Sequence, residues 1–298
     1  MNNMVYNLDD VQRIQNNIGE QELSQTTLDI LNNMISLLDI DVNIYNSKKD
    51  IDKRWEKQEI FKTTVILKKE GVDEKINDMR GILNKLSPTN YETKITEILS
   101  CIDVIFNEYP EESDVITKIM DMFYIIIQNN RFYVNIYVNV FIVLINKYTK
   151  FSEYSNMFID KYREYMTNFS FINPDKDYDQ FCEINQINDQ RKSVLMFIIH
   201  LIKSKLYPLS MIEDIINNLF NLIEQNINDK EYVEINEEIM ENISLLFTEA
   251  NELICNEDNK NSYLSKIEKF SKYKSSDYRG FSTRMKFKCI DLVDLCNM

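Results

Sequence analysis

The chain has 298 residues, of which 44% are hydrophobic, so it can bury a sizeable core in one large domain or two ordinary ones. It holds only 4 glycines and 4 prolines, and it has no Asn-Gly or Asp-Gly pair, so the tight turns that join strands are scarce and a nearly all-helical fold is expected. The formal net charge of −14 excludes a nucleic-acid-binding protein that uses its whole surface, although it allows a local basic patch.

The cysteines and the apolar runs indicate in which part of the cell the protein works. Five cysteines, spread along the chain and odd in number, do not form the pattern of a disulfide framework and suit a reducing environment. The first thirty residues are polar and show no signal peptide. The longest apolar run, residues 132–146, is too short for a membrane span and carries Asn135 and Asn139. We therefore expect a soluble, cytoplasmic protein with no membrane partner.

Residues 1–62 are predicted to form an N-terminal arm. They are mostly polar, with one helical pattern over 23–40 whose apolar residues recur at helical spacing. This helix could dock on the main domain or bind a partner protein.

Residues 63–298 are predicted to form one domain of successive helices. Their apolar residues follow a helical period, and the short links between helices favour antiparallel neighbours. About five antiparallel pairs would stack into an α-solenoid. The longest irregular link is expected at 170–187. The predicted helices are 74–86, 88–108, 112–129, 132–148, 151–169, 188–206, 209–227, 232–256, 261–272 and 282–296.

The residues that carry enzyme chemistry are scarce. The chain has one histidine, His200, and no Cys-x-x-Cys pair, and its few glycines cannot make a phosphate-binding loop. The carboxylates of residues 237–242 are expected to face solvent on a helix. The sequence therefore predicts no catalytic residue, no metal site and no cofactor, and the protein is not expected to be an enzyme.

A Ser-Pro pair marks a junction between two predicted helices. Leu83 and Leu86 would end the first helix, Ser87 would be the N-cap of the second, and Pro88 would occupy its first position. The sequence thus predicts a tight turn between antiparallel helices.

The segment around this junction, RGILNKLSPTNY at residues 80–91, resembles the opening of the middle domain of eukaryotic translation initiation factor 4G. That family has Thr where this chain has Ser87 and Phe where it has Tyr91. A second match, residues 280–296, resembles the last helix of that domain. A third, weaker match covers residues 191–212 and departs from the family at Ile199 and His200. The three matches follow the family order and together span about residues 75–298.

The resemblance implies a fold and a partner. The family domain consists of HEAT-type helix pairs and binds a DEAD-box RNA helicase of the initiation factor 4A type, whose ATPase and unwinding cycle it stimulates. The matching helicase-binding residues are Leu83, Leu86 and Tyr91 near the first helix pair, and Arg284 and Lys286 at the far end. An exposed apolar pair beside a tyrosine would make a small hot spot. The alternative is that both leucines belong to the core.

Residues 259–288 are rich in Lys and Arg, with Glu268 and Asp277 as their only acids. This local basic patch could face mRNA phosphates or an acidic lobe of the helicase, or it could be a solvated basic face. The candidate RNA contacts are Lys272, Lys274, Arg279 and Lys288.

The arm offers a loose match to a second family feature. Initiation factor 4G binds the cap-binding protein, initiation factor 4E, through a Tyr-x-x-x-x-Leu-apolar helix. Here Tyr6, Val11 and Ile14 could supply this contact, although Gln12 departs from the pattern.

The resemblance thus predicts a minimal scaffold that links a cap-binding protein on mRNA to the helicase. Alanine is almost absent, which indicates an AT-rich genome and suggests a version encoded by a virus or a protist. The alternative is a translational regulator or RNA-processing factor that captures a DEAD-box helicase without a cap-binding protein.

Overall fold

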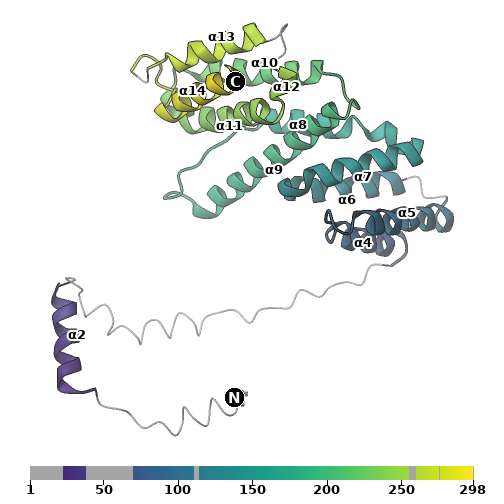
Figure 1. The fold of residues 1–298 in the computed structure, drawn as a ribbon, viewed down its shortest axis with the longest axis horizontal. Helices are drawn as coiled ribbons and strands as arrows, with labels where there is room; N and C mark the ends of the chain where they lie inside the picture. Colours follow the sequence, from purple (N-terminus) through teal and green to yellow (C-terminus); the bar gives the residue numbers. More distant parts are fainter. Residues whose placement is uncertain (1–22, 38–69, 111–113, 255–259, 275, 298) are drawn as a thin grey trace. The chain divides into compact units, whose positions relative to one another are not determined.

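The computed structural model describes residues 23–37, 70–110, 114–254, 260–274 and 276–297 (Figure 1). The chain divides into two units, Met1–Leu67 and Lys68–Met298. Every regular element in the described residues is helical, so the prediction of an all-α fold is confirmed. The expected boundary at residue 62 and the candidate contacts Tyr6, Val11 and Ile14 lie outside the described residues.

In the first unit the structure describes one helix, α2, Gln25–Leu37. It lies within the range 23–40 that the apolar pattern predicted. Ser24 precedes it, and the Thr27 amide donates to the Ser24 carbonyl at 2.9 Å and to the Ser24 hydroxyl at 3.3 Å, as at a helix N-terminus capped by serine. The side chains of Leu28, Leu31 and Met34 are exposed.

In the second unit, helices that are near one another in the sequence pack against one another. α4 contacts α5 and α6, α9 contacts α6, α7, α8 and α11, and α11 contacts α10 and α14. Among the described residues, no helix has the length and apolar character needed to cross a membrane. The elements are α4 Val72–Leu83, α5 Tyr91–Glu108, α6 Val115–Asn129, η2 Arg131–Tyr133, α7 Val134–Lys147, η3 Thr149–Tyr154, α8 Met157–Thr167, α9 Tyr178–Lys203, α10 Ser210–Asn226, η4 Lys230–Tyr232, α11 Val233–Glu249, α12 Asn251–Ile254, α13 Lys260–Ser271 and α14 Thr283–Asn297.

Most predicted helices are found close to their expected places, but α9 is longer. It begins at Tyr178 instead of residue 188, because Asp177 caps it and accepts a hydrogen bond from the Gln180 amide at 2.9 Å. The irregular link is therefore 168–177, and the prediction of a link over 170–187 is wrong. The predicted helix 151–169 is also divided, into η3 and α8.

A cluster of aromatic rings lies where α6, α7, α8 and α9 meet. The ring of Phe158 lies 4.7 Å from that of Phe197 and 5.2 Å from that of Phe141, and Phe123 stacks on Phe141 at 6.1 Å between ring centres. All four side chains are fully buried. Each such ring contributes roughly 2–3 kcal/mol by leaving water, and the edge-to-face contact of Phe141 with Phe158 adds to this.

Arg191 joins α8 to α9 from inside the core. It is 0% exposed. Its guanidinium donates to the backbone oxygens of Tyr165 at 3.3 Å and Asn168 at 3.2 Å, and to the Asn188 side chain at 2.6 Å. It also lies 3.9 Å from the ring centre of Phe169. The cation therefore caps the C-terminus of α8, where the helix dipole favours a positive charge.

We expect Arg191→Met to destabilise the second unit by about 2–4 kcal/mol, because it leaves buried carbonyl groups without a donor. Urea unfolding followed by circular dichroism measures this loss. Arg163→Met is the matched control, since Arg163 is exposed and, among the described residues, forms an ion pair only with Asp160 on its own helix. The control should change stability by roughly 0.5 kcal/mol or less. Equal losses in the two variants would contradict the role given to Arg191.

Candidate functional site

The α4–α5 junction holds the first set of predicted contacts. Leu83 is 1% exposed and Leu86 is 5% exposed, so the expectation of an exposed apolar pair is wrong. Leu83 continues the row of Ile76 and Met79, which recurs at helical spacing on the buried face of α4. The chain then turns back, with the Leu86 amide bonded to the Leu83 carbonyl at 3.1 Å, and this turn brings Leu86 into the same core.

The second helix of the junction starts later than the Ser-Pro pair suggested. α5 begins at Tyr91, with Asn90 before it, so the prediction of Ser87 as N-cap and Pro88 as first helical residue is wrong. The Asn90 side chain accepts from the Ser87 amide at 2.8 Å and donates to the Lys85 carbonyl at 2.9 Å. These two bonds close the turn locally and hold residues 87–90 out of the helix.

The outer surface of the junction is therefore made by other residues than the leucines. Lys85 and Pro88 are exposed, and Tyr91 is half-buried against the core. Burial raises the pKa of the Tyr91 hydroxyl, and the Glu92 carboxylate raises it further. Of the three helicase-binding residues expected here, Tyr91 alone presents part of its side chain to solvent.

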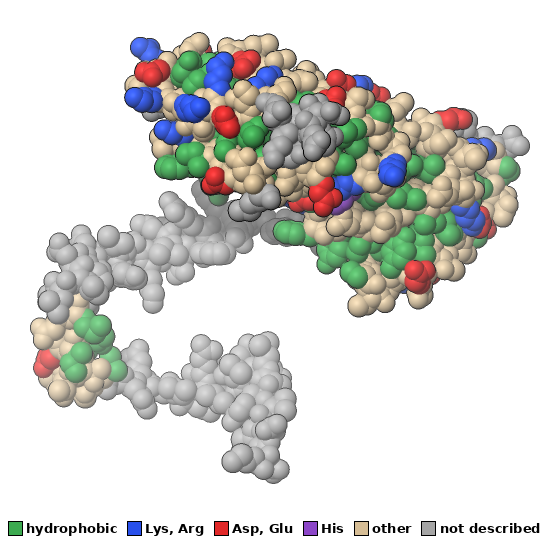
Figure 2. Space-filling view, turned by 45° about the horizontal axis from the view of Figure 1, so that its top comes forward, with side chains coloured by type: hydrophobic (Ala, Val, Ile, Leu, Met, Phe, Trp, Pro, Cys, Tyr) green, Lys and Arg blue, Asp and Glu red, His purple; other side chains and the backbone are tan. Residues whose placement is uncertain are grey.

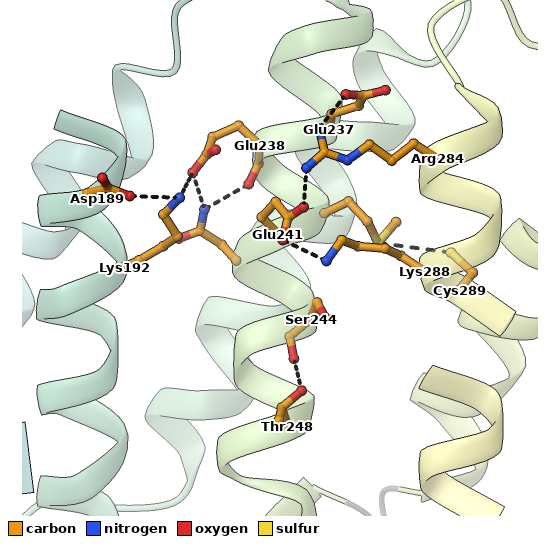
Figure 3. A network of polar contacts seen from close by, with 12 residues as sticks. Asp189, Lys192, Glu237, Glu238, Glu241, Ser244, Thr248, Arg284, Lys288 and Cys289 are labelled. Carbon is orange, nitrogen blue, oxygen red and sulfur yellow. Dashed lines mark hydrogen bonds and ion pairs between the residues drawn. The ribbon is translucent and has the colours of Figure 1, made fainter. Parts of the chain in front are cut away.

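At the other end of the unit, Arg284 is paired within the chain (Figure 3). Its guanidinium contacts Glu237 at 3.2 Å and Glu241 at 2.8 Å, both on α11. Lys288, one turn further along α14, contacts Glu241 at 2.7 Å. Two of the predicted contact residues thus tie α14 to α11. Lys286 is half-buried on the same helix and makes no ion pair with the described residues.

The opposite side of α11 is tied to α9. Lys192 lies 3.3 Å from Asp189 on its own helix and 3.4 Å from Glu238 on α11, as Figure 3 shows. Asn242 also donates to the Glu238 carboxylate at 3.3 Å. Burial raises the pKa of Glu238, and the nearby cations Lys192 and Arg191 oppose this only in part.

Residues 237–242 were expected to be a solvated surface, and that expectation is wrong. Successive carboxylates of α11 face different neighbours, with Glu238 on the α9 side and Glu237 and Glu241 on the α14 side. The charge signs alone could have suggested ion pairs. Their partners, however, lie more than forty positions away along the chain.

The basic segment follows α13. Lys272, Lys274 and Arg279 are exposed there, next to a stacked pair of rings, Tyr273 and Tyr278, whose centres lie 4.0 Å apart. Figure 2 shows Lys and Arg side chains gathered at the end of the unit that α13 occupies, with some acidic side chains between them. Lys288, the fourth predicted RNA contact, forms an ion pair with Glu241.

Gly280 fixes this segment to the turn after α10. Its amide donates to the Ile227 carbonyl at 2.8 Å, and its carbonyl accepts from Asn236 at 3.0 Å. A Cβ atom at this position would lie 2.5 Å from the Asn226 carbonyl oxygen, so only glycine fits. This close approach positions the neighbouring Arg279.

Comparison with known proteins adds no family to this description. No protein-family model matches the chain, and no curated protein matches it significantly. In the parts of the chain that the structure describes, no group of three or more His, Cys, Asp or Glu side chains is arranged to hold a metal ion.

We expect Glu238→Gln to be at least as stable as the unchanged protein at pH 7. Because the folded state raises the pKa of Glu238, the stability that this group contributes is fully present below its unfolded pKa and is lost as the pH rises through the folded pKa. The neutral amide avoids the cost of a buried charge, so its advantage should disappear below about pH 4.

Urea unfolding at several pH values tests this, with the exposed Glu231→Gln as the matched control. The control should stay within about 0.5 kcal/mol of the unchanged protein at every pH. If Glu238→Gln loses more than about 1 kcal/mol at pH 7, the ion pair with Lys192 outweighs the burial cost and the prediction is wrong.

Proposed function

We propose that this protein is a translation-initiation scaffold of the initiation factor 4G type, which binds a DEAD-box RNA helicase of the initiation factor 4A type. The proposal rests on the positions of the two segments that most resemble the initiation factor 4G domain. Residues 80–91 form the α4–α5 junction, and residues 282–287 open α14. These segments belong to the first and last helices in the order of contacts, as suits a scaffold that holds two lobes of one partner.

The proposed architecture is an α-solenoid of HEAT-type pairs. The pairs would be α4/α5, α6/α7, α8/α9, α10/α11 and α13/α14. This assignment is supported by the contacts between helices, since members of each pair touch the pair before or after them in the chain. An array of this kind separates its two ends, so one chain can contact two lobes of a helicase at once.

Because Leu83 and Leu86 are buried, we assign the helicase contact at the α4–α5 junction to other side chains. Leu83 and Leu86 shape the junction from beneath, and Lys85, Pro88 and Tyr91 form the surface that a partner would meet. At the far end, Lys286 is proposed as a direct contact. Arg284 would have to leave Glu237 and Glu241 before it could pair with a helicase lobe.

The basic segment is the proposed contact with mRNA. Lys272, Lys274 and Arg279 supply positive charge for phosphates, and the half-buried tyrosine pair beside them offers aromatic surface for a base. Direct binding to mRNA would keep the scaffold on the molecule that the helicase unwinds.

The arm is the proposed link to a cap-binding protein of the initiation factor 4E type, through Tyr6, Val11 and Ile14. The support is the sequence pattern and its place before the helical domain. Without this link, the same helical domain would act as a regulator or RNA-processing factor that captures the helicase alone.

For the helicase contact, we expect Lys85→Glu with Tyr91→Ala to weaken binding of a recombinant 4A-type helicase about tenfold, because both side chains lie on the junction surface. Pull-down and stimulation of helicase ATPase measure the effect. Lys176→Glu, an exposed charge reversal in the 168–177 link, is the control and should bind normally. Leu83→Ala is unsuitable, since a core cavity costs roughly 2–5 kcal/mol. Unchanged ATPase stimulation by the double variant would refute the contact.

For the arm, we expect Tyr6→Ala to abolish retention of the chain on cap-analogue resin loaded with a 4E-type protein, while helicase binding stays unchanged. The tyrosine is the anchor of the pattern, and a lost aromatic anchor costs roughly 2 kcal/mol or more. Retention of Tyr6→Ala at the normal level would rule out this contact. Helicase binding without any cap-binding partner would favour the regulator.

A further inference from the structure

A groove lies between the start of α9, α11 and the start of α14. Its volume is about 170 Å³. One wall is apolar and is formed by Phe171, Phe181 and Ile184. The other wall is acidic and is formed by Glu234, Glu237 and Glu241. We call it the α9–α11 groove.

The apolar wall comes from the start of α9 and the link before it, which the described elements leave partly uncovered. From Arg191 onward α9 is largely buried, but residues 178–187 are exposed or half-buried. Tyr178 is 67% exposed and Phe171, in the preceding link, is 41% exposed. Large apolar side chains gathered beside a groove are typical of an interaction surface.

The acidic wall already holds cations of the chain itself, Arg284 on Glu237 and Glu241 and Lys288 on Glu241. The Arg284 guanidinium bonds to Glu237 and Glu241, which lie one turn apart on α11. The two carboxylate side chains are 21% and 24% exposed, whereas the Arg284 side chain is 62% exposed. The chain's own arginine thus shows which chemistry this wall accepts. Because the cation lies largely in solvent, its ion pairs stabilise the fold little and can be exchanged.

We propose that the α9–α11 groove docks a basic amphipathic segment of a partner protein. Apolar side chains of the segment pack on Phe171, Phe181 and Ile184, and one of its Lys or Arg side chains takes the place of Arg284 on Glu237 and Glu241. The charge of the wall selects this occupant, since carboxylates attract cations and repel nucleic-acid phosphates. The inference requires neither the helicase nor the cap-binding protein.

In this arrangement Arg284 competes with the partner from within the chain. Its removal frees Glu237 and one oxygen of Glu241, whose other oxygen stays paired with Lys288, so a basic segment binds more tightly. An Arg284 that contacts an acidic partner directly would have the opposite effect, because its removal would weaken binding. Whether removal of Arg284 strengthens or weakens binding therefore distinguishes this inference from the helicase contact proposed for the same residue.

The test is fluorescence anisotropy with the full chain and three labelled synthetic peptides of about 18 residues, long enough for five helical turns. One peptide places leucine and lysine at amphipathic helical spacing, one replaces lysine with glutamate, and one replaces leucine with serine. Only the leucine–lysine peptide should bind saturably. Phe171→Ser and Glu234→Lys should each weaken it about fivefold, and Arg284→Gln should strengthen it about threefold.

Each variant has a matched control at an exposed position elsewhere. Phe132→Ser removes an aromatic ring from η2, Glu252→Lys reverses a charge on α12, and Lys150→Gln removes one positive charge. All three controls should bind the peptide as the unchanged chain does, and circular dichroism checks that every variant is folded.

Three results would overturn the inference. The first is a control that weakens binding as much as its groove variant does. The second is weaker binding by Arg284→Gln. The third is equal binding of the serine–lysine peptide, which would show attraction to the net charge and no use of the apolar wall.

Discussion

The second unit depends on the burial of one helix segment. From Val194 to Ile202 almost every side chain of α9 is buried, and the helix meets α6, α7, α8 and α11 around its circumference. A helix segment enclosed in this way can carry few polar groups. The buried charge of Arg191, just before this segment, is met by three hydrogen-bond acceptors. Helices on both sides of α9 therefore share a single set of packing contacts. A change within this segment would be felt in both halves of the unit.

Around this apolar centre, charges tie the later helices together. The carboxylates of α11 reach Lys192 on one side and Arg284 and Lys288 on the other. Exposed ion pairs add little stability, and the partly buried Glu238 carries a cost of its own. The ion pairs of α11 instead determine which charges remain unpaired at the surface. Part of the basic C-terminal region is neutralised inside the chain, and the segment of Lys272, Lys274 and Arg279 is left as the exposed basic surface.

The helical fold and most helix positions could be predicted, because apolar side chains recur at the helical period along the chain. The starts of α5 and α9 could not, since each is decided by a few hydrogen bonds of one side chain, Asn90 or Asp177. The same period places Leu83 on the buried face of α4, although the family resemblance had suggested an exposed position. The ion pairs of Arg284 could not be predicted either, because its partners are remote in the sequence. The α9–α11 groove follows only once α9 is known to begin at Tyr178.

Gly280 has a mechanical consequence for the basic segment. Its amide and carbonyl are both bonded to the α10–α11 end of the unit, and no side chain fits between them and the Asn226 backbone. A pull on Arg279 is therefore passed to α10 and α11 through these bonds, as well as along the backbone to α13 and α14. A long polymer held at this segment would exert its tension on the body of the unit, and the attachment point would resist peeling.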